Sequence, residues 1–227
     1  MNYTIENIAR ITGGFVARND LPADAHFPIL SIDSRTLING ENTLFFALKG
    51  QRHNGHLYIN DLVVRNIKAF VVSEPIRIDH LKKVAIIQVS DSREALQKLT
   101  AYHRSRFQYP VIGITGSNGK TIIKEWLYDL LSENFSIVRS PKSYNSQVGV
   151  PLSVWNMQKS NNLGIFEAGI SKPGEMVNLE RIISPTIGVF TNIGDAHQEN
   201  FSGLEVKVKE KLLLFRAAEK LIFCADH

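Results

Sequence analysis

The sequence has very little cysteine and no long apolar run. Cys224 is the only cysteine among 227 residues, so no disulfide can form within the chain, which fits a reducing compartment. It stands in an apolar, strand-like run, and we expect a buried structural thiol. No apolar stretch approaches membrane-spanning length, and the start, MNYTIEN, has neither the basic residues nor the apolar core of a signal peptide. We therefore expect a soluble cytoplasmic protein with no membrane insertion.

An excess of charge of one sign is also missing. The net charge is only +4, and lysine and arginine form no dense cluster interleaved with aromatic residues, so we expect no nucleic-acid partner. The mild positive balance suits an anionic substrate. The sequence shows no internal repeat, no low-complexity tract and no Asn-Lys-x-Asp stretch of the kind that guanine-reading switches carry. What remains is an ordinary globular composition, long enough for one large or two small domains.

The clearest motif is a glycine-rich segment between an apolar strand and a helix. Val111–Ile114 is a short apolar run, Thr115–Thr121 reads TGSNGKT, and apolar residues then recur at helical spacing as far as Leu131. Strand, glycine-rich loop and helix form the context that a phosphate-binding loop requires. Gly116 and Gly119 let the backbone wrap closely around anionic oxygens. The free N–H groups at the helix start then point at the phosphates.

Two side chains complete this loop. Lys120 can reach a terminal phosphate, and the Thr121 hydroxyl can take a position on Mg²⁺. The strict Walker pattern requires glycine five residues before Gly119, where this chain has Ile114. The motif is therefore a shortened relative of that pattern. It predicts a nucleotide-phosphate site, and the alternative is a glycine-rich turn with an incidental lysine.

The first part of the chain predicts a small α/β domain. Thr4 can cap a short helix that Gly13 stops. Further strands are expected at residues 15–17, 29–32, 44–48, 69–72 and 84–89, with helices at 56–66 and from about 91 to 107. We place a domain boundary near residue 108, which gives domains of residues 1–108 and 109–227.

Within this first domain, the segment Asp33–Ile59 has an apolar centre and flanks rich in glycine, asparagine and charge. Such a loop–strand–loop can hold a polar ligand by its backbone and by Ser34, Arg35 and Lys49. An ordinary solvated connection would have the same composition. The residues alone leave both interpretations open.

The second part alternates strands with helices, which predicts a mostly parallel sheet covered by helices and hence an α/β fold. Strands are expected at residues 136–138, 163–167, 186–191 and 221–225, and helices at 150–155, 174–183 and 204–218. Ligands of such sheets lie beyond the carboxyl ends of the strands. The glycine-rich loop, Glu167 and Thr191–His197 all fall at such ends, so we expect them to converge on one crevice.

The polar residues of this crevice differ in how well they suit a metal. Glu167 is a better ligand for Mg²⁺ than His197, because Mg²⁺ prefers oxygen. Farther on, Lys207 and Lys209 lie in a predicted helix, where a solvated basic face is the simplest interpretation.

Several of these motifs together resemble the Mur ligases. The segment DSR…LFFALKG is similar to the uridine-binding N-terminal domain of that family, and the resemblance covers essentially the whole chain. The motifs that carry it are TGSNGKT followed by Lys124-Glu125, YNSQVGVPLSV (Tyr144–Val154), EAGISKPGEM (Glu167–Met176) and TNIGDAHQENF (Thr191–Phe201).

The resemblance implies an ATP- and Mg²⁺-dependent amide ligase of peptidoglycan precursor synthesis. Order and spacing point to the branch that joins D-alanyl-D-alanine to UDP-N-acetylmuramoyl-tripeptide. The substrate carboxylate takes the γ-phosphoryl group of ATP, and the amine attacks the resulting acyl phosphate. This chemistry agrees with the residues, because a carboxylate accepts an amine only when its oxygen becomes a good leaving group. Bringing two anions together also requires positive charge.

The resemblance also implies roles for individual residues. Lys211 matches a lysine that is carbamylated in this family and acts as a carboxylate towards a second Mg²⁺, which requires a desolvated amine with a lowered pKa. The implied catalytic residues are Lys120, Lys211 and His197; the ATP-binding residues are Thr115, Gly116, Ser117, Asn118, Gly119, Lys120, Thr121 and Asn145; the metal ligands are Thr121, Glu167, His197 and Lys211; and the residues for the uridine-diphosphate substrate are Ser34, Arg35 and Lys49.

Two departures from the family pattern qualify this picture. Family members often have a second asparagine after Asn145, where this chain has Ser146. The family also has a third, C-terminal domain that helps to bind ATP and the incoming amine, whereas this chain stops at His227. We expect a central domain that is cut short, with partial binding and little or no turnover by these residues alone.

Two other functions remain open from the sequence. One is another ligase of the same superfamily, similar to folylpolyglutamate synthase, which shares the phosphate loop but lacks the uridine-binding domain. The other is a nucleotide-binding module without ligase activity, which would leave the N-terminal domain unexplained.

Overall fold

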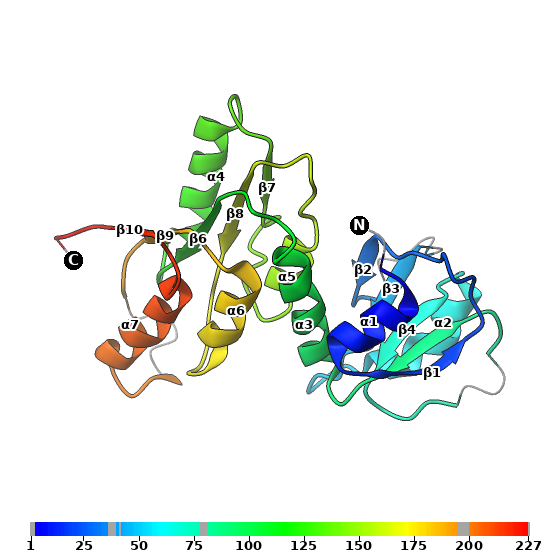
Figure 1. Cartoon of the computed structure of the whole chain (residues 1–227). Helices are drawn as coiled ribbons and strands as arrows, with labels where there is room; N and C mark the ends of the chain where they lie inside the picture. Colours follow the sequence, from blue (N-terminus) through cyan, green and yellow to red (C-terminus); the bar gives the residue numbers. More distant parts are fainter. Residues whose placement is uncertain (1–2, 36–39, 41, 78–80, 195–199, 227) are drawn as a thin grey trace. The chain divides into compact units, whose positions relative to one another are not determined.

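The computed structural model describes residues 3–35, 40, 42–77, 81–194 and 200–226. The chain divides into two compact units, Met1–Leu99 and Thr100–His227, and the division falls inside helix α3 (Ser92–Arg104). Figure 1 shows an α/β architecture in each unit, as the sequence predicted. The expected boundary near residue 108 stays a prediction.

The first unit holds a five-stranded sheet in the order β1-β5-β4-β3-β2. All neighbouring strands are parallel except β1 and β5, which run antiparallel. The inner strands β3 and β4 are buried along their whole length, and all their residues except Thr43 are apolar. Its elements are α1 (Ile5–Thr12), β1 (Phe15–Asn19), β2 (Ile29–Ser31), β3 (Thr43–Phe46), the 3₁₀ helix η1 (Gly55–Tyr58), α2 (Ile59–Val64), β4 (Ala69–Val72) and β5 (Ala85–Gln88).

The predicted ends of α1 are confirmed. The Thr4 hydroxyl accepts a hydrogen bond of 3.3 Å from the Asn7 N–H, and Gly13 ends the helix in the left-handed conformation with φ of 74°. The helix expected at residues 56–66 is instead a 3₁₀ turn, η1, that continues directly into the short α2.

The second unit holds a five-stranded sheet whose strands are all parallel, in the order β10-β9-β6-β8-β7. The parallel sheet is confirmed, and β6 lies at its centre. Its elements are β6 (Val111–Thr115), α4 (Lys120–Leu131), β7 (Ile137–Arg139), α5 (Gly149–Val154), β8 (Leu163–Glu167), α6 (Glu175–Ile183), β9 (Ile187–Phe190), α7 (Leu204–Leu212), the 3₁₀ helix η3 (Leu213–Phe215) and β10 (Lys220–Phe223).

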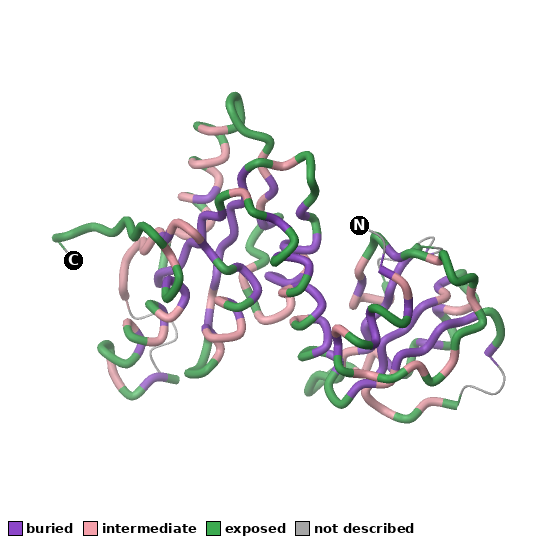
Figure 2. The backbone as a smooth tube through the Cα atoms, viewed as in Figure 1, coloured by how far each residue is buried: buried purple, intermediate pink, exposed green. Residues whose placement is uncertain are grey.

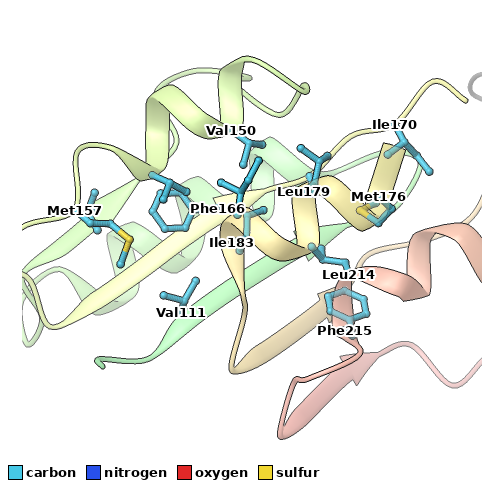
Figure 3. Packing of buried hydrophobic residues seen from close by; sticks show 14 of the residues in the cluster. Val111, Val150, Met157, Phe166, Ile170, Met176, Leu179, Ile183, Leu214 and Phe215 are labelled. Atoms are coloured by element: carbon cyan, nitrogen blue, oxygen red, sulfur yellow. The ribbon is translucent and has the colours of Figure 1, made fainter. Parts of the chain in front are cut away.

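Helices cover both faces of this second sheet. On one face, α5, α6 and η3 bury a large apolar cluster; Figure 3 shows Phe166 of β8 packed among Val150 of α5 and Leu179 of α6. On the other face, α4 packs its Ile123 and Leu127 on the inner strands. Leu131 packs there too, whereas Ile122, Trp126 and Leu130 are exposed, so only one of the two apolar faces of α4 is covered.

The last strand corrects the expectation for Cys224. All four residues of β10 are exposed, and Figure 2 shows this end of the chain as exposed. Cys224 follows the strand and is itself exposed and free. The prediction of a buried thiol was wrong because β10 is the edge strand of the sheet, where an apolar run does not guarantee burial.

No helix in the described part of the chain is long and apolar enough to span a membrane.

Candidate functional site

The TGSNGKT loop joins the central strand β6 to helix α4, as predicted. Gly116 has φ of +146°, and a Cβ there would lie 2.0 Å from the Thr191 hydroxyl oxygen, so only glycine fits. Gly119 has φ of +78° and precedes α4 with open space on its Cβ side. Within the described residues no side chain caps α4, which leaves its first N–H groups available to an anion.

The segment after β9 supports this loop from one side. Asn192 accepts hydrogen bonds from the Ser117 N–H at its carbonyl (2.9 Å) and from the Asn118 N–H at its side-chain oxygen (3.0 Å). The Thr191 hydroxyl donates to the Asn118 carbonyl at 2.6 Å, and Gly194 exchanges hydrogen bonds with the Ser117 side chain. The predicted convergence of the two strand ends is therefore confirmed as far as Gly194. His197 lies outside the described residues.

Glu167 stands at the end of β8, beside the start of the loop. The register pairs it with Ile114 of β6, so its carboxylate reaches the first turn of α4. One carboxylate oxygen accepts a 2.9 Å hydrogen bond from the Thr121 hydroxyl, which is also 3.3 Å from the Ser143 hydroxyl. Glu167 is fully buried. The two predicted oxygen ligands therefore meet at one point.

Lys124 holds the other side of the Glu167 carboxylate. Its side chain is fully buried, and its ammonium lies 3.2 Å from the second carboxylate oxygen. The same ammonium donates to the carbonyls of Ser140, at 2.8 Å, and Lys142. Lys124 therefore ties α4, β8 and the turn after β7 together. The residues alone did not reveal this role, although a lysine beside the packed Ile123 was a usable signal.

Three lysine ammonium groups lie around the loop. Lys120 donates to the carbonyls of Gly116 (3.0 Å) and Ser117 (3.1 Å), and Lys211 donates to the Gly116 carbonyl at 3.0 Å. Lys207 donates to the Gly194 carbonyl. These contacts bring Lys120 and Lys211 together as predicted.

Burial of the Lys120 and Lys211 ammonium groups lowers the pKa of both. For Lys211 the pKa falls to about 8, because burial and then the positive charges of Lys120 and Lys207 disfavour the ammonium form.

Helix α7 also corrects the expectation for Lys207. Lys207 is only 1% exposed, so a solvated face was wrong for this residue. It was right for Lys209, which is exposed and pairs with Glu205 at 2.6 Å. The two lysines are two residues apart and thus lie on different sides of the helix.

Asn145 lies in the connection before α5, beside the end of β8. Its carbonyl accepts a 2.8 Å hydrogen bond from the Gly169 N–H, and a Cβ on Gly169 would lie 3.1 Å from the Asn145 side chain. The glycine thus allows Asn145 to approach closely. Ser146 accepts a 3.1 Å hydrogen bond from the Gly149 N–H at the start of α5. It supports this turn in the structure.

The donor set around Thr121 and Glu167 fits Mg²⁺, because it consists of a hydroxyl and a carboxylate. When the Thr121 hydroxyl donates to the Glu167 carboxylate, the hydroxyl oxygen and the carboxylate each keep a free lone pair that can bind a metal. Among the described residues, no three histidine, cysteine or acidic side chains cluster to form a metal site of their own. A metal at this point therefore needs further oxygens, such as those of a nucleotide.

A separate pocket lies in the first unit, and the predicted Ser34, Arg35 and Lys49 all line it. It has a volume of about 650 Å³, which is ample for a nucleotide. The wall consists of Ile32, Asp33, Ser34, Arg35, Phe45, Leu48, Lys49, Gly50, Gln51, Arg52, His53, Gly55, Tyr58 and Arg93. The loop–strand–loop segment is therefore a concave wall and not a simple connection.

The predicted cations of this pocket are paired with carboxylates. Arg35 forms two hydrogen bonds from its guanidinium to Asp33, of 2.9 and 2.8 Å, and these hold the pKa of Asp33 down at about 2. Lys49 lies 2.5 Å from Glu74. Both cations remain largely exposed, so a ligand phosphate can compete for them.

Sequence reasoning did not single out the two further arginines and the tyrosine of this pocket. Arg52 and Tyr58 lie within the segment Asp33–Ile59 but carried no distinguishing pattern, and Arg93 comes from the first turn of α3, far along the chain. Arg52 and Arg93 are both exposed. Together with Arg35 and Lys49 they make the pocket rich in positive charge.

Comparison with known proteins identifies the family to which this arrangement belongs. The Mur ligase middle domain matches residues 114–227, and the model described as Mur ligase family, catalytic domain, matches residues 26–104. The chain belongs to the Mur ligase family. The matched ranges contain both the phosphate loop and the charged pocket of this Mur ligase chain.

Curated relatives and solved structures agree on the branch that they resemble. The UDP-N-acetylmuramoyl-tripeptide--D-alanyl-D-alanine ligase of Rickettsia prowazekii is 37% identical, over 78% of this chain and 39% of its own length. The ligase of the same name from Bacillus subtilis is 28% identical, over 98% of this chain and 49% of its own length. MurF from Acinetobacter baumannii superposes with a TM-score of 0.86 at 28% identity, over 96% of this chain and 47% of that one. A MurF ligase from Thermotoga maritima, solved in complex with ADP, has a TM-score of 0.77 at 29% identity, over 87% and 46%.

This Mur ligase chain thus spans about half the length, or less, of the relatives that it matches.

Proposed function

We propose that this chain provides the nucleotide site and the muramyl-substrate site of an ATP-dependent amide ligase of cytoplasmic peptidoglycan precursor synthesis. The ligase joins D-alanyl-D-alanine to UDP-N-acetylmuramoyl-tripeptide. The names of the relatives and the two family matches, over residues 26–104 and 114–227, support this assignment, in which the expected domains are residues 1–108 and 109–227. The observation that carries it is the meeting of the glycine-rich loop, the Thr121–Glu167 oxygen pair and the ammonium groups of Lys120 and Lys211 at one edge of a parallel sheet.

The chain's residues can perform the binding steps of this reaction. The N–H groups at the start of α4 and the Lys120 ammonium hold the phosphates of ATP. When the substrate carboxylate attacks the γ-phosphorus and ADP leaves, Lys120 offsets the repulsion between the two anions. The amine then attacks the acyl phosphate, and inorganic phosphate leaves. Bound Mg²⁺, held by Thr121 and Glu167, would supply further charge neutralisation there.

Lys211 suits the carbamylation that the family resemblance implies. Carbamylation requires the neutral amine, and burial with two neighbouring cations lowers the Lys211 pKa to about 8. A useful neutral fraction is therefore present near neutral pH. Its 3.0 Å contact with the Gly116 carbonyl places the amine beside the phosphate loop. His197 remains a proposed ligand from the resemblance alone.

The charged pocket of the first unit suits the uridine-diphosphate part of the substrate. Its volume accommodates a nucleotide, and the guanidinium groups of Arg35, Arg52 and Arg93 match the fork geometry that phosphates favour. Tyr58 provides an aromatic face in the same wall.

The test is a calorimetric titration of this chain with UDP-N-acetylmuramoyl-tripeptide, free UDP, folate and Mg²⁺-ADP. We expect UDP-dependent binding at the pocket, independent ADP binding at the loop and no folate binding. Replacing Arg35 with alanine should weaken UDP about tenfold or more, since a charged hydrogen bond is lost. Arg18→Ala, which removes an ion pair with Asp20 outside the pocket, is the matched control.

Two results would contradict the proposal. Binding of folate in place of UDP would favour a ligase similar to folylpolyglutamate synthase. ADP binding without any muramyl-nucleotide binding, both here and in a longer chain of the same protein, would favour a nucleotide-binding module.

A further inference from the structure

Helix α7 presents lysines of two kinds. The side chains of Lys207 and Lys211 are one turn apart, and they are only 1% and 3% exposed. Between them in sequence, the Lys209 side chain is 73% exposed and pairs with Glu205. A solvated basic helix would expose all three, so the burial of Lys207 requires its own explanation.

The Lys207 ammonium carries three N–H donors. Within the described residues, its ammonium donates to the Gly194 carbonyl, and Gly194 in turn contacts the Ser117 side chain of the phosphate loop. Lys207 is therefore one residue removed from the loop that Lys120 and Lys211 contact directly.

The charges around the loop are unbalanced. The positive charge of Lys207 acts on both Lys120 and Lys211 and disfavours their ammonium forms, so the three groups lie within electrostatic range of one another. Glu167 is the one carboxylate, within the described chain, that acts on Lys120, and it is already paired with the buried Lys124. Burying like charges together is unfavourable unless an anion joins them.

We propose that Lys207 is a third cation of the polyphosphate site, acting beside Lys120 on the phosphate chain of the bound nucleotide. The inference rests on the proposed nucleotide function, and it adds a binding residue to it. Lys207 binds through charge and through the N–H donors that Gly194 does not use. Its place on α7 also lets nucleotide binding tighten the contact between α7 and the loop.

A purely structural alternative is that Lys207 only anchors Gly194. The two roles predict different changes in ligand affinity when Lys207 is replaced. An anchor shapes the whole nucleotide site, so its loss would affect adenosine as much as ADP. A phosphate-binding cation responds to the number of phosphates, is weakened by salt and is replaceable by another cation.

The experiment compares the Lys207→Met, Lys207→Arg and Lys209→Met variants of this chain by calorimetry. The probes are inorganic tripolyphosphate, ADP and adenosine, each at low and high salt. We expect Lys207→Met to weaken tripolyphosphate and ADP about tenfold, corresponding to one charged hydrogen bond, and to leave adenosine unchanged. Lys207→Arg should recover most of the loss. Lys209→Met should bind all probes within about twofold of the parent chain, since its charge is solvated.

Each other outcome has a definite meaning. If Lys207→Met binds tripolyphosphate as well as Lys209→Met does, the inference is wrong and the proposed nucleotide function stands. An equal loss for adenosine that arginine does not restore would assign Lys207 the anchoring role and also overturn the inference. If the parent chain, shown to be folded by its circular dichroism, binds neither polyphosphate nor ADP, the proposed function and the inference fall together.

Discussion

The phosphate loop and the pocket of the first unit both gather positive charge, but they hold it in different ways. Around the loop, the half-buried Lys120 and the buried Lys211 donate to backbone carbonyls. In the pocket, Arg35 and Lys49 are exposed and bound to carboxylates. The loop is thus preorganised by its backbone, whereas the pocket exchanges one partner for another when a ligand enters. We expect a substitution in the buried Lys124–Glu167 pair beside the loop to lower stability, and substitutions of the pocket cations to weaken binding with little loss of stability.

The largest effect is expected at Lys124. Lys124→Met leaves the fully buried Glu167 without its cation, and breaking a buried ion pair costs about 3–5 kcal/mol of unfolding free energy. Urea unfolding measures this loss. The matched control is Lys98→Met, which removes a pair with Glu94 on the exposed face of α3 and should cost no more than about 0.5 kcal/mol.

A double variant sharpens the result for Lys124. Adding Glu167→Gln removes the unpaired charge, so the double variant should be more stable than Lys124→Met alone. If the second substitution makes the chain still less stable, the ion pair is not what holds these elements together.

A smaller effect is expected from pH, through His103 in the second unit. Burial lowers the pKa of His103 to about 4, while the unfolded chain titrates near 6.5. The unfolded state therefore takes up a proton first as the pH falls. The neutral His103 therefore contributes about 3 kcal/mol to the unfolding free energy above pH 6.5, and this contribution is lost progressively as the pH falls to about 4.

Urea unfolding between pH 7 and 4 measures this dependence. His103→Gln keeps a donor for the Met157 carbonyl but does not titrate, so it should flatten the curve in this window. The exposed His26, changed to glutamine, is the control. An unchanged slope in His103→Gln would exclude His103 as its source.

The first unit also contains a buried histidine, His56, which can be compared with His103 of the second unit. His56 accepts N–H groups from Ser73 and Glu74 at one ring nitrogen, so it must be neutral, and burial lowers its pKa. The negative charge of Glu74 opposes that shift. Lowering the pH should therefore lower the stability of the first unit as it does that of the second, but by a smaller amount.

The smallest effect on stability is expected at Lys49. Its pair with Glu74 is exposed, so Lys49→Met should change the unfolding free energy by less than about 1 kcal/mol. UDP binding should nevertheless weaken severalfold, because a phosphate would take the place of Glu74. Lys98→Met serves again as the control for removal of an exposed lysine, now with unchanged UDP affinity. A large loss of stability in Lys49→Met would contradict the contrast between the two sites.

Local patterns in the sequence account for much of the second unit. Alternating apolar runs predicted the parallel strands, and TGSNGKT predicted the loop at the end of β6. The position of Glu167 after an apolar strand predicted its approach to Thr121, because parallel strands end at one edge of the sheet. These features depend on periodicity and on glycine conformation, which neighbouring residues largely determine.

Other features depended on contacts between distant segments. Lys207 and Lys209 look alike in sequence, yet only the packing of α7 against the loop decides which one is buried. Arg93 joins the pocket from another element, and Cys224 is exposed because its strand lies at an edge.

The sequence by itself therefore determined the α/β alternation, the phosphate loop and the family, since these are encoded by residues that are close together in the chain. The tertiary structure decided which charges are buried, which are paired and which remain open to a ligand. The reason is that desolvation and ion pairing depend on the distance between groups in space, and the spacing of residues along the chain does not contain that distance.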